Sequence, residues 1–170
     1  LLIMGEWWFH TRFEEDRTKF NRYIIQITTV GRAVERFMEI IDETRLKVWA
    51  KQPADFLKCA TVDMDGTKAG TTGECKHGMD ISYDGVWGYH PLLLTLAQTG
   101  EALRIVNRSG NRPSHEQADV YLDKAATLCR RAGFKKITFR GDTDFSQTRH
   151  LDRWDRAGHR FVFGIDAMPN

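Results

Sequence analysis

The spacing of apolar residues predicts a helix over residues 32–51. Apolar side chains recur there at intervals of three and four, which places them on one face of an α-helix. These residues are Val34, Phe37, Met38, Ile41, Val48 and Trp49. Pro53 helps to end the helix. A weaker helical pattern precedes it, so we expect a helical segment over residues 1–54 and a second domain over residues 55–170.

Residues 59–65 alternate between apolar and polar side chains. Successive side chains of a β-strand point to opposite sides, so this alternation predicts a strand with two unlike faces. One face is expected to carry Ala60, Val62 and Met64. The other is expected to carry Thr61, Asp63 and Asp65. Two carboxylates therefore share one face of this strand.

Turn residues predict two antiparallel pairs of strands further along. Asp84-Gly85, between short runs of strand-forming residues, is typical of a hairpin turn. Residues 98–100 separate the apolar runs at residues 92–96 and 102–106, which predicts a second pair.

A helix, a strand, a second helix and a final strand are expected in the rest of the chain. Ser114 and Gln117 have the spacing of a capping box, which predicts the start of the first of these helices. Gly133 is placed to end that helix in a left-handed conformation. Residues 137–140 alternate as a short strand, and residues 161–165 form the last one.

This order of elements predicts an α/β fold with a mixed sheet. Short turns join the first three strands, which should therefore be antiparallel. The later strands follow crossover helices and should be parallel. Ribonuclease H-like folds begin in this way, and so do other folds.

Composition excludes several classes of protein. The 170 residues suffice for one domain with a core, and 41% hydrophobic residues are too many for a disordered chain. No apolar run approaches the roughly 20 residues that span a bilayer, so we expect no membrane partner. The 25 Lys and Arg residues nearly balance 23 Asp and Glu, so bulk charge does not indicate nucleic-acid binding. The three cysteines favour a reducing cytosol.

Aspartates stand at the ends of two predicted strands. Asp63 and Asp65 lie on the first, and Asp142 follows the strand at residues 137–140. Ligands collect beyond the carboxyl ends of strands in open α/β sheets, so these carboxylates converge if the two strands are neighbours. Converging carboxylates need a cation, and Mg²⁺ or Mn²⁺ would take them as oxygen ligands. The alternative is that these aspartates only form turns.

Four short motifs resemble those of insertion-sequence transposases of the DDE class, whose catalytic domain is ribonuclease H-like. They are Val62-Asp63-Met64-Asp65-Gly66-Thr67, Gly88-Tyr89-His90-Pro91-Leu92-Leu93, Asn107-Arg108-Ser109-Gly110-Asn111 and Arg140-Gly141-Asp142. The resemblance extends from residue 59 to the C-terminus. It implies that Asp65, more than Asp63, is the first catalytic aspartate and that Asp142 is the second. All three are candidate metal ligands.

The chain also departs from the family pattern. The family's third acidic residue, a glutamate on a later helix, has no counterpart before Asn170, so we expect an incomplete catalytic domain. The chain begins at Leu1, which fits a piece of a longer protein. Thr143-Asp144 stand where the family usually has small residues.

The resemblance implies metal-dependent cleavage of DNA phosphodiesters and strand transfer during DNA transposition. The cofactor would be Mg²⁺ or Mn²⁺, and the partner would be DNA, at the transposon ends and at the target. It further implies a homodimer in the full-length protein and a bacterial cytoplasmic location, at the nucleoid when DNA is bound. The chain alone, with two of three carboxylates, is expected to bind metal weakly and to cut DNA poorly or not at all.

Two alternatives remain open at this point. Asp63-Met64-Asp65-Gly66-Thr67 also resembles the nucleophile motif of haloacid dehalogenase-like phosphatases, in which the first aspartate is phosphorylated. The second alternative is a non-catalytic DNA-binding fragment. It rests on a basic segment that could contact phosphates, formed by Arg149, His150, Arg153, Arg156, His159 and Arg160.

Overall fold

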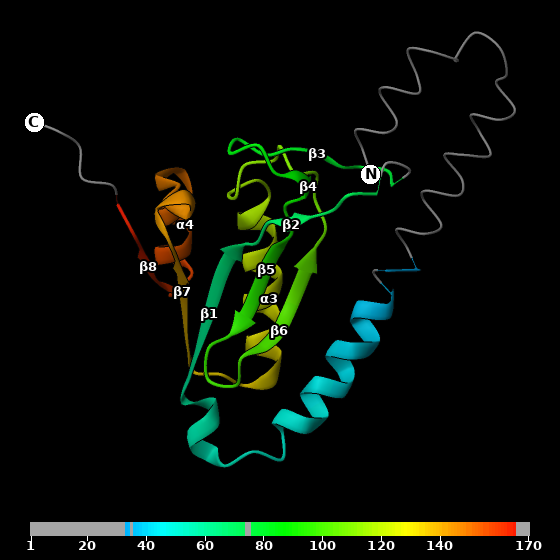
Figure 1. The fold of residues 1–170 in the computed structure, drawn as a ribbon. Coiled ribbons are helices and arrows are strands. Elements are labelled where there is room, and N and C mark those ends of the chain that lie inside the picture. Colours follow the sequence, from blue (N-terminus) through cyan, green and yellow to red (C-terminus); the bar gives the residue numbers. More distant parts are fainter. Residues whose placement is uncertain (1–32, 35, 74–75, 166–170) are drawn as a thin grey trace, which may run out of the picture.

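One mixed β-sheet forms the centre of the protein (Figure 1). This computed structural model describes residues 33–34, 36–73 and 76–165. The strands of the main sheet are β1 (Cys59–Gly66), β5 (Leu92–Leu96), β6 (Glu101–Val106), β7 (Lys136–Gly141) and β8 (Arg160–Phe163). Their spatial order is β6-β5-β1-β7-β8.

The directions of these strands match the predicted mixed α/β fold. β1 and β5 are antiparallel, as are β5 and β6. β7 is parallel to both β1 and β8. The antiparallel half of the sheet is thus joined to a parallel half along β1.

A second, smaller sheet contains the predicted hairpin. Its strands are β2 (Ala69–Gly70), β3 (Asp80–Ile81) and β4 (Trp87–Tyr89), in the order β2-β4-β3. The Asp84-Gly85 turn joins β3 to β4, and Gly85 has a positive φ of 84°. The Gly85 N–H donates to the Ser82 carbonyl at 2.9 Å. The hairpin prediction is confirmed, although the hairpin lies outside the main sheet.

The helices connect the parallel strands. α3 (Ala118–Ala132) precedes β7, and α4 (Leu151–Arg156) precedes β8. Three short 3₁₀ helices are η1 (Ala54–Lys58), η2 (Thr143–Phe145) and η3 (Thr148–His150). Gly133 ends α3 with a φ of 95°, as predicted.

The predicted capping box is wrong. Gln117 takes a left-handed conformation with a φ of 58°, and no side chain caps α3. Backbone turns satisfy the N–H groups there, because Ala118 N–H donates to the His115 carbonyl at 3.1 Å. The Ser114 hydroxyl donates instead to Asp144 at 2.8 Å. Ser114 therefore hydrogen-bonds to a residue that is distant in the sequence and does not cap α3.

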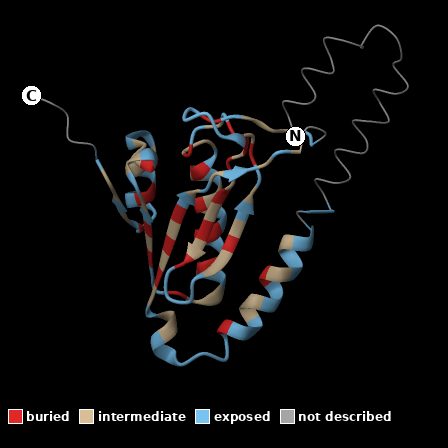
Figure 2. Cartoon of the chain, in the orientation of Figure 1, coloured by how far each residue is buried: buried red, intermediate tan, exposed pale blue. Residues whose placement is uncertain are grey.

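The core lies between the sheet and α3 (Figure 2). In β1 the alternating residues Ala60, Val62 and Met64 are buried, as their pattern predicts. The buried ring of Phe139 in β7 packs against Trp154 of α4, with ring centroids 5.1 Å apart. The opposite face of β1 carries Asp63 and Asp65.

The helix formed by residues 36–49 is anchored to the main sheet. Asp42, which is 5% exposed, pairs with Arg45 of its own helix and with Arg104 of β6. The Trp49 indole N–H donates to Glu101 at 2.7 Å. Part of the predicted apolar face remains exposed, including Phe37 at 62%. The weaker helical pattern upstream lies outside the described residues, and the division at residue 54 stays a prediction.

Candidate active site

The parallel pairing of β1 and β7 brings the predicted aspartates to one rim of the sheet. Asp63 and Arg140 are register partners, the last pair in this ladder. Asp65 stands two residues after Asp63, and Asp142 stands two residues after Arg140. Asp142 keeps an extended backbone, with φ −77° and ψ −167°. Neighbouring strands lie about 4.8 Å apart, so a continuation of this register beyond its last pair would place these two aspartates next to each other.

Asp65 is an accessible aspartate at the carboxyl end of β1. It stands one residue before the end of β1 and is exposed. In the part of the chain that the structure describes, its carboxylate has no hydrogen bond or ion pair. Both oxygens are therefore free to accept a cation.

Asp63 is held by an arginine instead. Arg140 donates from Nε to Asp63 Oδ1 and from Nη2 to Oδ2, both at 2.6 Å. This bidentate pair raises the pKa of the Arg140 guanidinium, chiefly through the hydrogen bonds to Asp63. Both carboxylate oxygens are thus engaged by a fixed positive charge.

Asp142 is oriented by the short helix that it starts. Its Oδ1 accepts the backbone N–H of Asp144 at 3.0 Å, which makes it the N-cap of η2. This bond fixes the carboxylate at the point where the chain leaves β7. Asp142 is exposed like Asp65, so the rim carries two accessible carboxylates.

A buried arginine builds the loops above this rim. Arg108 donates from Nε to the His90 carbonyl at 3.0 Å and from Nη1 to the Ser114 carbonyl at 2.9 Å. Burial lowers the pKa of its guanidinium. Arg108 therefore joins the segment between β4 and β5 to the segment before α3. The sequence contained Arg108 in a motif but did not indicate this structural role.

The glycines of the motifs allow close backbone contacts in the same place. A Cβ on Gly110 would collide with the carbonyl oxygens of Asp80 and Gly88. The Thr67 N–H donates to the Pro91 carbonyl at 3.0 Å, which ties the end of β1 to the start of β5. Two of the four motifs thus support the rim, while the other two carry its aspartates. The sequence signal for this supporting role was the glycine that each of these two motifs contains, because glycine allows a close approach of another backbone segment.

The basic segment at residues 149–160 is partly neutralised from within. Arg153 forms ion pairs with Asp119 and Asp123 of α3. His159 is buried, and its Nε2 hydrogen-bonds to Arg130 at 2.9 Å, with burial lowering the pKa of its imidazole. These contacts join the region of α4 to α3. They leave less of the segment available for phosphates than its composition indicates.

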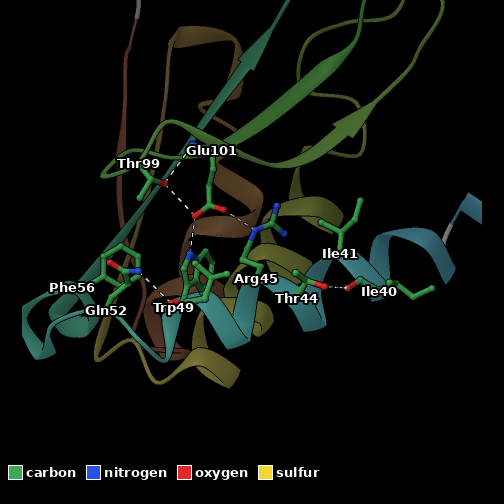
Figure 3. A pocket seen from close by; sticks show the side chains of 10 residues that line it. Ile40, Ile41, Thr44, Arg45, Trp49, Gln52, Phe56, Thr99 and Glu101 are labelled. Carbon is green, nitrogen blue, oxygen red and sulfur yellow. Dashed lines mark hydrogen bonds and ion pairs between the residues drawn. The ribbon is translucent and has the colours of Figure 1, made fainter.

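A pocket lies away from these carboxylates (Figure 3). Its volume is about 540 Å³, and it lies between the helix at residues 36–49 and the β5–β6 turn. Glu101 stands on its wall, where it accepts from Trp49 and Arg45. Leu96, at the start of this turn, pairs with Val62 in β1. The pocket is therefore displaced from the rim toward the amino end of β1.

The donor set of the rim suits a weakly bound divalent cation. Within the described ranges, no group of three or more His, Cys, Asp or Glu residues could hold a metal ion. Asp65 and Asp142 supply hard oxygen donors, and Mg²⁺ commonly takes one or two carboxylates along with water and substrate phosphate oxygens. Two carboxylates on adjacent strand ends fit that pattern. Asp63 fits it poorly because of Arg140.

Comparison with known proteins identifies the family of the chain. No curated protein matches the chain. No helix in the described part is both long enough and apolar enough to cross a membrane. The family model described as transposase DDE domain group 1 matches residues 18–168, which is most of the chain. The resemblance inferred from the four motifs is confirmed, and the chain belongs to the transposase DDE domain family.

Proposed function

We propose that this chain is part of the catalytic core of a DNA transposase and that its chemistry is metal-dependent cleavage of DNA phosphodiesters followed by strand transfer. The observation that carries this proposal is the parallel pairing of β1 and β7, whose last register pair, Asp63 and Arg140, stands two residues before Asp65 and Asp142. The order and directions of the five strands support a ribonuclease H-like assignment of the domain. Family membership supports DNA as the partner.

Asp65 and Asp142 are the proposed ligands for Mg²⁺ or Mn²⁺. Asp65 and Asp142 would hold these ions, whose chemistry would be to neutralise charge on the phosphodiester and to activate the attacking water or 3′-hydroxyl. The protein's share is to hold the carboxylates at a fixed separation and in a fixed orientation. Asp63 has a supporting part in this scheme, because its pairing with Arg140 holds β1 and β7 together next to the ligands.

The proposal also includes an expectation for the activity of residues 1–170 alone. Two carboxylates give weaker metal binding than three, so we expect poor DNA cleavage by residues 1–170 alone. A homodimer of the full-length protein, and a bacterial cytoplasmic location at the nucleoid when DNA is bound, follow from the family resemblance and belong to the same proposal. So does the assignment of residues 55–170 to the catalytic domain, with residues 1–54 as a helical segment.

The two alternatives have less support. A haloacid dehalogenase-like phosphatase would use Asp63 as its nucleophile, yet both oxygens of Asp63 accept from Arg140. A non-catalytic DNA-binding fragment would rely on the basic segment at residues 149–160, of which Arg153 pairs with α3. Membership of a DDE transposase family favours the catalytic interpretation over both.

Titration with Mn²⁺, followed by electron paramagnetic resonance of the free ion, tests the proposal. We expect weak binding that is lost in Asp65→Asn and Asp142→Asn and reduced less in Asp63→Asn. Asp55→Asn is a matched control, because Asp55 is an exposed carboxylate in η1, which precedes β1. Equal binding by the wild type, Asp65→Asn and Asp142→Asn would refute the metal site. Hydrolysis of a chromogenic phosphate ester that is lost in Asp63→Asn would favour the phosphatase instead.

A further inference from the structure

A buried serine hydroxyl links the two strand ends that carry the proposed metal ligands. Ser114 is 8% exposed and precedes α3. Its Oγ donates to Oδ2 of Asp144 at 2.8 Å. Asp144 lies in η2, immediately beyond the end of β7, so this bond joins two segments that are 30 residues apart. The sequence around Ser114 and Asp144 does not indicate that these two residues are hydrogen-bonded.

The same hydroxyl lies against the end of β1. A Cβ placed on Gly66 would be 3.1 Å from Ser114 Oγ and 2.7 Å from His90 Nε2. Gly66 directly follows Asp65. Ser114 therefore lies close to the glycine beside one proposed ligand, and it hydrogen-bonds to the loop that carries the other.

The far end of this connection reaches Asp142. The backbone N–H of Asp144 donates to Asp142 Oδ1 at 3.0 Å, while the Asp144 side chain accepts from Ser114. Asp144 is thus fixed at both its backbone and its carboxylate. Phe145, the next residue of η2, is 2% exposed and anchors this short helix in the core.

We propose that Ser114 and Asp144 are positioning residues that set the separation and orientation of Asp142 relative to Asp65. This inference rests on the proposed metal site and adds two residues that do not bind the ion themselves. A hydrogen bond from a hydroxyl to a carboxylate is charge-assisted and stronger than a neutral one. Partners of this kind around metal ligands typically change metal affinity by about tenfold or more when they are removed.

Four variants separate positioning from a direct effect of the Asp144 charge. Ser114→Ala and Asp144→Ala each remove the hydrogen bond, and we expect each to raise the Kd for Mn²⁺ by about tenfold. The double variant should bind no more weakly than either single one, because both changes break the same contact. Asp144→Asn keeps a carbonyl oxygen that can accept from Ser114, so its Kd should stay close to that of the wild type.

Amide hydrogen exchange without metal gives an independent readout. The Asp144 N–H should exchange faster in Ser114→Ala and at the wild-type rate in Asp144→Asn. Asp55→Ala removes the same charge at the other end of β1 and should change neither the Kd nor this exchange rate. Asp144 is exposed, so Asp144→Ala remains informative even if the buried Ser114→Ala change unfolds the protein.

The outcomes distinguish this inference from the proposed function. Loss of affinity in Asp144→Asn equal to that in Asp144→Ala, with Ser114→Ala unaffected, would show a direct effect of charge and overturn the inference. Binding lost in Asp65→Asn and Asp142→Asn but kept in Ser114→Ala and Asp144→Ala would overturn the inference alone. Binding that is absent from the wild type, or indifferent to Asp65→Asn and Asp142→Asn, would overturn both.

Discussion

Three aspartates at one rim of the sheet are chemically identical but have different surroundings. Asp63 is engaged at both oxygens by Arg140, Asp142 accepts a backbone N–H, and Asp65 is exposed. A carboxylate that already accepts two guanidinium hydrogen bonds must give them up before it can bind a cation. Identical residues at one rim of the sheet therefore differ in their ability to act as ligands.

The Arg140 pair gives a prediction at the scale of one residue. Arg140→Gln should lower the Kd for Mn²⁺, because it removes a positive charge beside the site and releases Asp63. Titration with Mn²⁺ measures the change. Arg36→Gln removes the same charge from an exposed ion pair on the helix at residues 36–49 and should leave the Kd unchanged. Weaker binding in Arg140→Gln would contradict this prediction, because it would show that the support the ion pair gives to β1 and β7 outweighs the effect of its positive charge.

Gly66 is the second residue whose replacement is informative. In Gly66→Ala the new methyl group would press on His90, whose ring is buried and held by a 2.8 Å contact to the Arg112 carbonyl. We expect a loss of about 2 kcal/mol in the free energy of unfolding, as for other overpacked sites. Urea denaturation measures it.

Gly73→Ala serves as the control for that experiment. Its methyl group would meet only the flexible side chain of Lys76. The free energy of unfolding should change by less than about 0.5 kcal/mol. Equal losses in Gly66→Ala and Gly73→Ala would contradict the close packing at the end of β1.

At the scale of elements, the helix at residues 36–49 is joined to the sheet through charged side chains. Asp42 accepts from Arg104 of β6 at 2.5 Å and from Arg45 at 2.7 Å, and the three side chains are about nine-tenths buried. Glu101 extends this network to Trp49. A buried ion network satisfies its members only when all are present, so it defines one docked position for the helix.

Removal of Asp42 should therefore destabilise the protein strongly. Asp42→Ala leaves two buried guanidinium groups without their shared partner, and the expected loss is about 3 kcal/mol in the free energy of unfolding. Glu39→Ala, on the same helix, breaks only the exposed pair with Arg36 and should cost less than about 0.5 kcal/mol. Urea unfolding of both variants checks this difference. Similar losses would mean that the network does not hold the helix.

Across the whole molecule, the acidic rim and the basic segment have different roles. The carboxylates at the ends of β1 and β7 are accessible, whereas Arg153 and His159 of the basic segment contact α3. Charge that is already paired with carboxylates of the protein adds little to DNA binding through counterion release. The segment thus contributes to the packing of α4 on α3.

This gives a prediction for DNA binding by the whole chain. Arg153→Gln should lower the thermal midpoint of unfolding and leave the salt dependence of DNA affinity unchanged. Fluorescence anisotropy with duplex DNA at two salt concentrations measures the second quantity. A phosphate contact would appear as a decrease of about one in the salt slope. Such a decrease in Arg153→Gln would contradict the internal role of this arginine.

Local pattern was sufficient for several features of this protein. The alternation at residues 59–65 placed Asp63 and Asp65 on one strand face, and their buried neighbours confirm it. Asp84-Gly85 and Gly133 were identified correctly because a positive φ restricts the residue type at a turn or helix end. The four motifs indicated the family because each is a short run of adjacent residues that can be recognised without knowledge of the fold.

Tertiary structure alone decided which polar groups meet. Arg140 pairs with Asp63 across 77 residues of sequence, and Ser114 bonds to Asp144 where a local capping box was expected. Asp42, a polar residue, is buried on a helix whose Phe37 is exposed. Periodicity depends on the geometry of one element, whereas a hydrogen-bond partner depends on which elements fold against each other. The sequence by itself thus determined the elements, the family and the candidate aspartates, and the pairing of β7 with β1 decided which of these aspartates Arg140 engages.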